Sequence, residues 1–399
     1  MEFMGYARPD GKVGVRNYLL VFAAGRGTAN LATMIADSIR GARLYMAPNE
    51  NGRSADDRKT LTRTMIGLAK NPNVGGVLVV SLKEDGGYPE FTYDGIIGEI
   101  ERSGKPVAPI IVEREGGFYQ ALGKGIRRGR ALAREISANR RVPCDFGQLF
   151  VACKCGYSDA SSGMAGNPVI GNLFDRLVDA GGTAMFSETT EVIGAEHLVA
   201  KRFTNNAERE KFLAAVRRVE NDALNVGQDI RTINPIPANI QAGLTTLEEK
   251  SLGAIAKAGH RPITECLKYG EIPTSPGLKF MDSWMSSSAL FIGFAASGAA
   301  ITIFQIGGGA MPEHFPAPTA NTGLVAPTLY ATGNPRTWES GSDELDFNSS
   351  PVITEKRSVE EVGEQLAKVV CGIASGTLTQ GETLNVREHL EVYMRTPGL

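Results

Sequence analysis

The fold is decided by one stretch of the chain, Cys153-Lys154-Cys155-Gly156-Tyr157-Ser158-Asp159-Ala160-Ser161-Ser162-Gly163-Met164-Ala165-Gly166-Asn167-Pro168. The apolar run 148–152 before it predicts a buried strand. Apolar residues at helical spacing from 169 to 178 predict a helix after it, with Pro168 in the first turn. A strand, a long polar loop and a helix start form the arrangement in which open α/β sheets bind ligands. The alternative is a long ordinary connection. The candidate site residues of this loop are Ser158, Asp159, Ser162 and Asn167.

The composition is that of an ordinary soluble globular protein. Of 399 residues, 42% are hydrophobic and 22% charged, so the chain can bury a core, and its length predicts two or three domains. A net charge of −2 gives no reason to expect nucleic-acid or membrane-surface binding. The first residues lack a secretory pattern, no apolar run is long enough to cross a bilayer, and five cysteines are too few for a disulfide framework. We expect a cytoplasmic protein.

Strands and helices alternate through the first part of the chain. Apolar runs predict strands at 18–23, 44–46, 76–81 and 107–112, and helical patterns predict helices that end at 39, 70, 103 and 139. This alternation predicts a Rossmann-like, doubly wound parallel sheet in residues 1–142, and a larger, less regular α/β domain in residues 143–399. Gly25-Arg26-Gly27 lacks the third glycine of a dinucleotide-binding loop, because position 30 is Asn, so a tight turn is expected there.

Three features of the second part could carry chemistry. Glu188, Glu191, Glu196 and His197 follow a strand predicted at 183–187, and such groups serve acid–base catalysis or bind metals. The alternative is a set of solvated charges at a helix start.

A helix capped by Thr245 or Thr246 and ended by Gly259 carries Lys250 and Lys257 on one face, and could be an ordinary surface helix. Gly308 and Gly309 follow a strand at 300–305, where free N–H groups could hold an anion or the chain could simply turn.

Several motifs, in order along most of the chain, resemble the altronate/galactarate dehydratase family, which includes the large subunit of sulfolactate sulfo-lyase. They are Gly5-Tyr6-x-Arg8-x-Asp10-Gly11-x-x-Gly14-x-Arg16-Asn17, Pro72-Asn73-Val74, Cys155-Gly156-x-Ser158-Asp159-Ala160-x-Ser162-Gly163-x-Ala165-x-Asn167-Pro168, Ser187-Glu188-Thr189-x-Glu191-x-Ile193-Gly194-Ala195-Glu196, and Gly243-Leu244-Thr245-Thr246-Leu247-Glu248-Glu249-Lys250-Ser251-Leu252-Gly253-Ala254-Ile255-x-Lys257-x-Gly259.

The resemblance implies a lyase that removes water or sulfite from a small carboxylate-bearing hydroxy acid, aided by a divalent metal such as Fe²⁺ or Mn²⁺. Such an elimination needs a base, an acid for the leaving group, and positive charge beside the carboxylate. We predict proton transfer or metal contact for Asp159, Glu188, Glu191, Lys250 and Lys257, with Cys155 and Glu188 as candidate metal ligands. The family's small N-terminal β-rich domain is not expected here, so a separate small subunit is a predicted partner. A homo-oligomer is also expected.

The chain departs from the family pattern at three strand ends. Where members usually carry cysteine or histidine, it has Arg26, the segment from Asn49 to Arg53, and Lys83. Strand ends of a parallel sheet lie along one edge, so Arg26, Arg53 and Lys83 are predicted to converge. With Asn49 they would bind an anionic substrate between the two domains, near the acidic loop 188–196. Loss of soft ligands counts against a thiolate–imidazole metal site. The alternative is that the cations point into solvent.

Two other functions remain open from the sequence. The first is a metal-independent hydrolase or isomerase of a small acid on the same scaffold, which the replaced cysteine and histidine positions favour. The second is a catalytically degenerate binding subunit that depends on a partner, which the absence of the β-rich domain favours.

Overall fold

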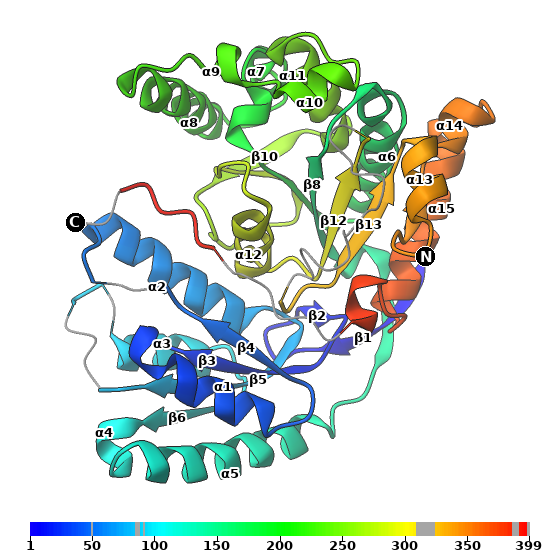
Figure 1. Ribbon diagram of the computed structural model, residues 1–399. Helices are drawn as coiled ribbons and strands as arrows, with labels where there is room; N and C mark the ends of the chain where they lie inside the picture. Colours follow the sequence, from blue (N-terminus) through cyan, green and yellow to red (C-terminus); the bar gives the residue numbers. More distant parts are fainter. Residues whose placement is uncertain (49–50, 84–87, 91, 309–323, 385–390, 397–399) are drawn as a thin grey trace.

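The computed structural model of the protein describes residues 1–48, 51–83, 88–90, 92–308, 324–384 and 391–396. Strands of the described residues form three sheets, two of which are parallel throughout, with helices on their faces (Figure 1). The predicted α/β class is therefore confirmed. Among these residues, no helix combines the length and the apolar character that a membrane crossing requires.

The first parallel sheet has the strand order β4-β3-β5-β6. Its strands are β3 (Tyr18–Ala23), β4 (Ala42–Met46), β5 (Val74–Ser81) and β6 (Val107–Ile111). One face is covered by α1 (Ala29–Asp37) and α5 (Phe118–Ile136), and the other by α2 (Ala55–Lys70) and α3 (Tyr93–Glu101). The short α4 (Val112–Glu115) follows β6. Every residue of β5 is buried, as expected for an inner strand covered on both faces.

The second parallel sheet has the strand order β10-β11-β9-β8-β12-β13-β14. Its strands are β8 (Phe150–Gly156), β9 (Thr183–Phe186), β10 (Ile263–Leu267), β11 (Gly277–Met281), β12 (Ile301–Ile306), β13 (Thr328–Thr332) and β14 (Phe347–Asn348). One face packs on α6 (Asn167–Asp179) and α15 (Val359–Ala374), and the other on α12 (Ser287–Ser297). The remaining helices are α7 (Glu196–Ala200), α8 (Asn206–Asn225), α9 (Ile230–Ile233), α10 (Pro237–Gln241), α11 (Leu247–Ile255), α13 (Pro335–Gly341) and α14 (Pro351–Thr354).

A third, antiparallel sheet joins the start of the chain to the start of the second parallel sheet. It consists of β1 (Glu2–Ala7), β2 (Val13–Gly14) and β7 (Val142–Asp145), with β1 in the middle. Phe3 pairs with Cys144 in this sheet, and both residues belong to the core beneath the second parallel sheet. The sequence patterns did not predict this sheet, because its strands are short and its partners lie far apart along the chain.

The two parallel sheets meet where α2 packs against α12 (Figure 1). Gly67 permits this contact, since a Cβ atom at this position would lie 2.2 Å from the carbonyl oxygen of Ala296. A buried ion pair, Arg16 to Glu382 at 2.6 Å, ties the beginning of the chain to a turn near its end. The carboxylate of Asp57 accepts hydrogen bonds from the backbone N–H of Arg395 at 2.8 Å and of Thr396 at 3.1 Å.

The structure corrects the prediction for the stretch that decides the fold. The strand predicted at 148–152 is β8 and runs on to Gly156, so the polar loop is only a short turn. Helical structure already starts at Ala160, because Asp159 Oδ1 accepts the N–H of Ser162 at 3.0 Å and caps it. A π-helical turn over Ser162–Gly166 precedes α6. The predicted helix is confirmed as α6, with Pro168 in its first turn, where backbone hydrogen bonding is already interrupted.

Candidate functional site

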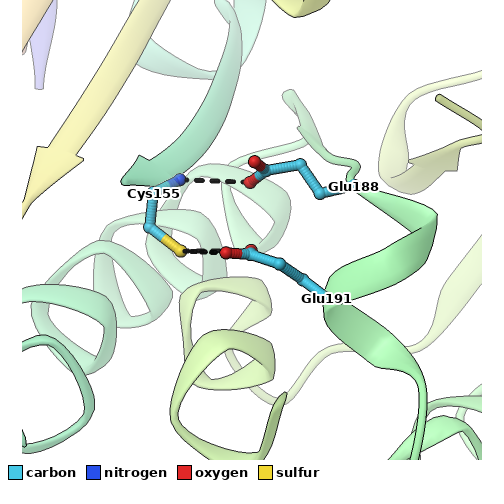
Figure 2. Close-up of side chains that lie close together, drawn as sticks. All are labelled: Cys155, Glu188 and Glu191. Carbon is cyan, nitrogen blue, oxygen red and sulfur yellow. Dashed lines mark hydrogen bonds between the residues drawn. The ribbon is translucent and has the colours of Figure 1, made fainter. Parts of the chain in front are cut away.

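Two carboxylates and a thiol meet at the carboxyl ends of β8 and β9. Cys155 lies near the end of β8, and Glu188 and Glu191 follow the end of the neighbouring β9 (Figure 2). The backbone N–H of Cys155 donates to Oε2 of Glu188 at 3.3 Å, and its thiol donates to Oε2 of Glu191 at 3.2 Å. Glu188 has a φ of +75°, a left-handed conformation that is uncommon outside glycine. The chain is held in this unfavourable turn where the acids face the strand end.

Lys257 completes the cluster from the short turn after α11. Its ammonium donates to Oε2 of Glu191 at 2.6 Å, to Oε2 of Glu188 at 2.8 Å and to Sγ of Cys155 at 3.3 Å, which uses all three of its N–H donors. A second ammonium, on Lys154, lies 3.6 Å from Oε1 of Glu188. We call these five residues the acid–base cluster. It combines two carboxylates with two ammonium groups, and all five members are buried.

Burial and mutual charge move the pKa values of the cluster in different directions. Burial and the charge of Glu191 raise the pKa of Glu188. Burial alone would also raise the pKa of Glu191, but Lys257 and Lys250 outweigh it and lower that pKa to about 2. Burial opposes the charge on Lys257, but the groups facing it raise its pKa well above the usual value. Burial, aided by Glu191, raises the pKa of Cys155 to about 12, so the thiol stays protonated at neutral pH.

The three atoms that could ligate a cation already surround an ammonium group. Cys155, Glu188 and Glu191 each offer one ligand atom, and these atoms lie within 4.8 Å of one another. Lys257 donates hydrogen bonds to all three of these residues. This arrangement does not fit a divalent ion, because the ion would have to displace Lys257. The predicted Fe²⁺ or Mn²⁺ stays a prediction.

A cleft of about 260 Å³ opens between the helical turns after β8 and α11. Among the residues lining it are Ser158, Asp159, Ser162, Asn167, Lys250 and Gly253. The two helical segments approach closely at Gly163 and Gly253, where a Cβ on Gly163 would lie 3.2 Å from the Cα of Gly253. The cleft thus lies within the predicted second domain, residues 143–399, and its described lining includes no residue of the first parallel sheet.

Lys250 brings positive charge to the wall of this cleft. The residue is only 9% exposed, and its ammonium donates to the amide oxygens of Asn234 at 2.8 Å and Asn239 at 3.2 Å. No ion pair involving Lys250 occurs within the described part of the chain. Ligand carboxylates bind well to a desolvated ammonium that has only neutral acceptors. Lys250 and Lys257 are both buried, so these two side chains do not lie on the exposed face of their segment.

Asp159 lines the cleft, and its carboxylate also accepts hydrogen bonds that connect three segments of the fold. Its carboxylate accepts from the hydroxyl of Ser161 at 2.6 Å, the N–H of Gly308 at 2.6 Å and the amide of Asn334 at 2.7 Å. The hydroxyl of Ser162 also lies 3.3 Å from this carboxylate. The N–H of Gly308, for which the sequence suggested a bound anion, therefore binds the carboxylate of Asp159. Gly309 lies outside the described residues.

Two family models cover most of the chain. Residues 146–396 match the C-terminal model of D-galactarate/altronate dehydratase, and residues 5–137 match the second domain of D-galactarate dehydratase/altronate hydrolase. The chain belongs to this dehydratase family. The predicted family and its lyase class are thereby confirmed.

Three relatives illustrate the range of the galactarate/altronate dehydratase family. The (2R)-sulfolactate sulfo-lyase subunit beta of Chromohalobacter salexigens is 34% identical over 97% of this chain and 96% of its own length. Altronate dehydratase of Bacillus subtilis is 27% identical over 97% of this chain and 76% of its own length. Galactarate dehydratase (L-threo-forming) of Escherichia coli is 31% identical over 79% of this chain, which covers 59% of that enzyme. All three names describe lyases.

The predicted convergence of cations at the first sheet stays a prediction. Strands β3, β4 and β5 are parallel neighbours, so their carboxyl ends do share one edge. Lys83 is exposed, whereas Arg53 is half-buried and its guanidinium donates to the carbonyl of Thr396 at 3.5 Å. Asn49 and the side chain of Arg26 lie outside the described part. In the acidic loop, Glu188 and Glu191 both pair with Lys257.

Sequence reasoning missed several residues that shape the site. Lys154 was not singled out, although an ionic residue between two cysteines of a buried strand signals a polar strand end. Asn234 and Asn239, which hold Lys250, belong to a polar loop without a recognisable motif. Gln305 on β12 is fully buried beside Cys155, and neither of its amide atoms has a partner among the described residues. The amides of Asn234, Asn239 and Gln305 can be recognised as parts of the site only in the folded structure.

Proposed function

We propose that the chain is a lyase that eliminates water or sulfite from a small, carboxylate-bearing hydroxy acid bound in the cleft beside Lys250. The observation that carries this proposal is the nearly buried ammonium of Lys250, which two neutral amides hold at the cleft wall without a carboxylate partner among the described residues. It offers the positive charge that the substrate carboxylate, and the enediolate formed from it, requires. Lys250 and the acid–base cluster are linked electrostatically, since the charge of Lys250 lowers the pKa of Glu191.

Glu188 is the proposed general base. Its pKa is raised by burial and by Glu191, toward the range in which a carboxylate accepts protons well, whereas the low pKa of Glu191 makes that residue a poor base. Glu188 takes the proton from the carbon next to the carboxylate, and the electron pair forms the carbon–carbon double bond as the β-substituent leaves. A leaving hydroxide takes up the proton from Glu188 to form water, while sulfite leaves without needing it. Lys257 stays an ammonium and balances the charge of Glu191.

The test is turnover of galactarate, altronate and sulfolactate, each with and without Fe²⁺ or Mn²⁺. Glu188→Gln should abolish turnover of the accepted acid while leaving its binding measurable. Glu196→Gln is the matched control, because Glu196 follows closely at the start of α7 but accepts a hydrogen bond only from the N–H of Gly194 within the described residues. Equal loss in both variants would contradict the role of Glu188. Absence of turnover across the panel, with any co-purifying partner present, would overturn the proposed reaction.

We also propose that a second, smaller subunit completes the enzyme in the cytoplasm. The name of the sulfo-lyase relative describes a subunit beta, and that protein matches this chain over nearly its full length. All five cysteines are free and buried, which suits a reducing compartment. Affinity purification of the tagged chain from its native host should recover a small β-rich protein in fixed proportion. Full activity of the isolated chain would exclude an obligate partner. Self-association into a homo-oligomer stays a prediction, to be measured by light scattering.

A further inference from the structure

The wall of the cleft carries a buried amide with an unused acceptor. Asn167 is 1% exposed, and its Nδ2 donates to the carbonyl oxygen of Gly253 at 2.9 Å. Because a carbonyl oxygen can only accept, this bond fixes which end of the amide is the donor. Oδ1 is buried and has no hydrogen-bond partner among the residues that the structure describes. Buried polar atoms are nearly always paired, so this oxygen is left to accept from a donor that the described residues do not supply.

A second buried amide lies behind this wall. Gln305 packs its side chain on Gly166, the residue before Asn167, so closely that a Cβ there would lie 2.2 Å from Nε2 of Gln305. Within the described part of the chain, neither amide atom of Gln305 has a partner, and the residue is fully buried. Its strand neighbour is Cys155, a member of the acid–base cluster. Asn167 thus lines the cleft, and Gln305 lies next to both Gly166 and that cluster.

The chemistry of the cleft restricts what can satisfy Oδ1 of Asn167. Lys250 in the same wall attracts an anion, while the two carboxylates of the lining, Asp159 and Glu249, already accept hydrogen bonds from the chain itself. An anionic ligand presents an N–H or O–H donor only through a substituent other than its acid group. We propose that Asn167 recognises a hydroxyl group of the substrate, and that Gln305 supports this recognition from behind. This inference rests on the proposed function, because it assumes that the acid binds beside Lys250. It makes Asn167 the residue that distinguishes hydroxy acids from acids of the same shape without hydroxyl groups.

Binding of matched pairs of acids tests this inference without requiring turnover. Galactarate and adipate share a six-carbon dicarboxylate chain and differ in their hydroxyl groups, and sulfolactate and 3-sulfopropanoate form the corresponding pair of sulfonates. The full chain, with any co-purifying partner, should bind the hydroxylated member of at least one pair about tenfold or more tightly in calorimetry, as expected for a hydrogen bond to a buried acceptor. Equal affinity within both pairs would overturn the inference but leave the proposed function standing. If neither member of either pair binds and altronate does not bind either, the proposed function itself fails.

Variants locate the preference at the two amides. Asn167→Leu should reduce the preference for the hydroxylated acid about tenfold while leaving the affinity for its partner acid within about twofold. Gln305→Met should reduce it by a smaller factor. Asn172→Leu is the control, because Asn172 lies on the same helix outside the cleft lining and bonds to Arg176. If Asn167→Leu fails to fold, Asn167→Ser provides the same comparison with a smaller side chain. An unchanged preference in a folded Asn167 variant would contradict the inference.

Discussion

The ammonium of Lys257 lies 2.6 Å from Oε2 of Glu191, and both side chains are almost completely buried. Glu188 shares the same ammonium at 2.8 Å. Removing this cation would leave two carboxylates in a site that water scarcely reaches, which is among the most destabilising changes a single substitution can make.

Lys257→Met should therefore lower the free energy of unfolding by about 3–5 kcal/mol. Denaturant unfolding at pH 7 measures the change. Lys59→Met is the control, since the Lys59–Asp56 pair is exposed and its loss should change stability by less than about 1 kcal/mol. Similar losses in the two variants would show that the Lys257 ammonium is not the counter-charge we describe.

The stabilising contribution of Glu191 should disappear in acid. The folded-state pKa of Glu191, about 2, lies below its ordinary value of 4.5, so the ionised group stabilises the fold above pH 4.5. That stabilisation is lost as the pH falls from about 4.5 toward 2. The stability gap between wild type and Glu191→Gln should be on the order of 3 kcal/mol at pH 7 and shrink steadily down to pH 3.

Glu188 should show the opposite trend, because its folded-state pKa is raised. Its neutral form is favoured in the fold, so Glu188→Gln should become more stable relative to wild type as the pH rises above 4.5. Unfolding curves between pH 3 and pH 8 compare both variants with wild type. If the stability of both variants relative to wild type changed with pH in the same direction, a raised pKa for Glu188 and a lowered pKa for Glu191 could not both be right.

Lys250 should matter more for binding than for folding. Lys250→Gln removes a charged hydrogen-bond donor from the cleft, and the affinity for the accepted hydroxy acid should fall by about 1.5–3 kcal/mol. Lys250→Arg should restore only part of it, since the planar guanidinium does not reproduce the ammonium geometry. Calorimetric titration measures the effect, and unchanged affinity in a folded Lys250→Gln protein would remove Lys250 from the binding site.

Gly67 should be indispensable where the two parallel sheets meet. Gly67→Ala places a Cβ 2.2 Å from the carbonyl oxygen of Ala296, so α2 and α12 must separate, and we expect a loss of about 1–3 kcal/mol. Gly98→Ala in α3 is the matched control. Its Cβ would meet only the end of Arg102 at 3.9 Å, so that substitution should be neutral or stabilising by up to about 1 kcal/mol. Thermal unfolding distinguishes the two, and equal effects would contradict the packing argument.

The alternating strands and helices of the first sheet could be predicted because each element has a strong local pattern. Ser54, for example, caps α2 by accepting the backbone N–H of Asp57. The second sheet was harder, since β8 pairs with β12 far along the chain and the apolar α12 has no polar face. Cys153 and Cys155 extend β8 past the predicted end because both side chains are buried, which a local pattern does not show.

The site was predictable as a set of residues but not as an arrangement. Glu188, Glu191, Lys250 and Lys257 were all candidates from their sequence contexts. Their division into a buried cluster and a cleft wall depends on how the turn after α11 packs against β8 and β9. The same limit applies to Asp159, whose capping of a helix that begins at Ala160 was not evident in a segment that reads as a loop.

The strand order of the second sheet also has a consequence for synthesis on the ribosome. All strands of the first sheet are complete once Ile111 has emerged, so that sheet can assemble while the chain is still growing. β9 can pair with one edge of β8 soon afterwards. The other edge of β8 pairs with β12, which is synthesised much later. At translation rates of about 5–20 residues per second, this second edge stays unpaired for roughly 7–30 s. During that interval a nascent chain presents an unpaired, apolar strand edge, and we expect a chaperone to shield it.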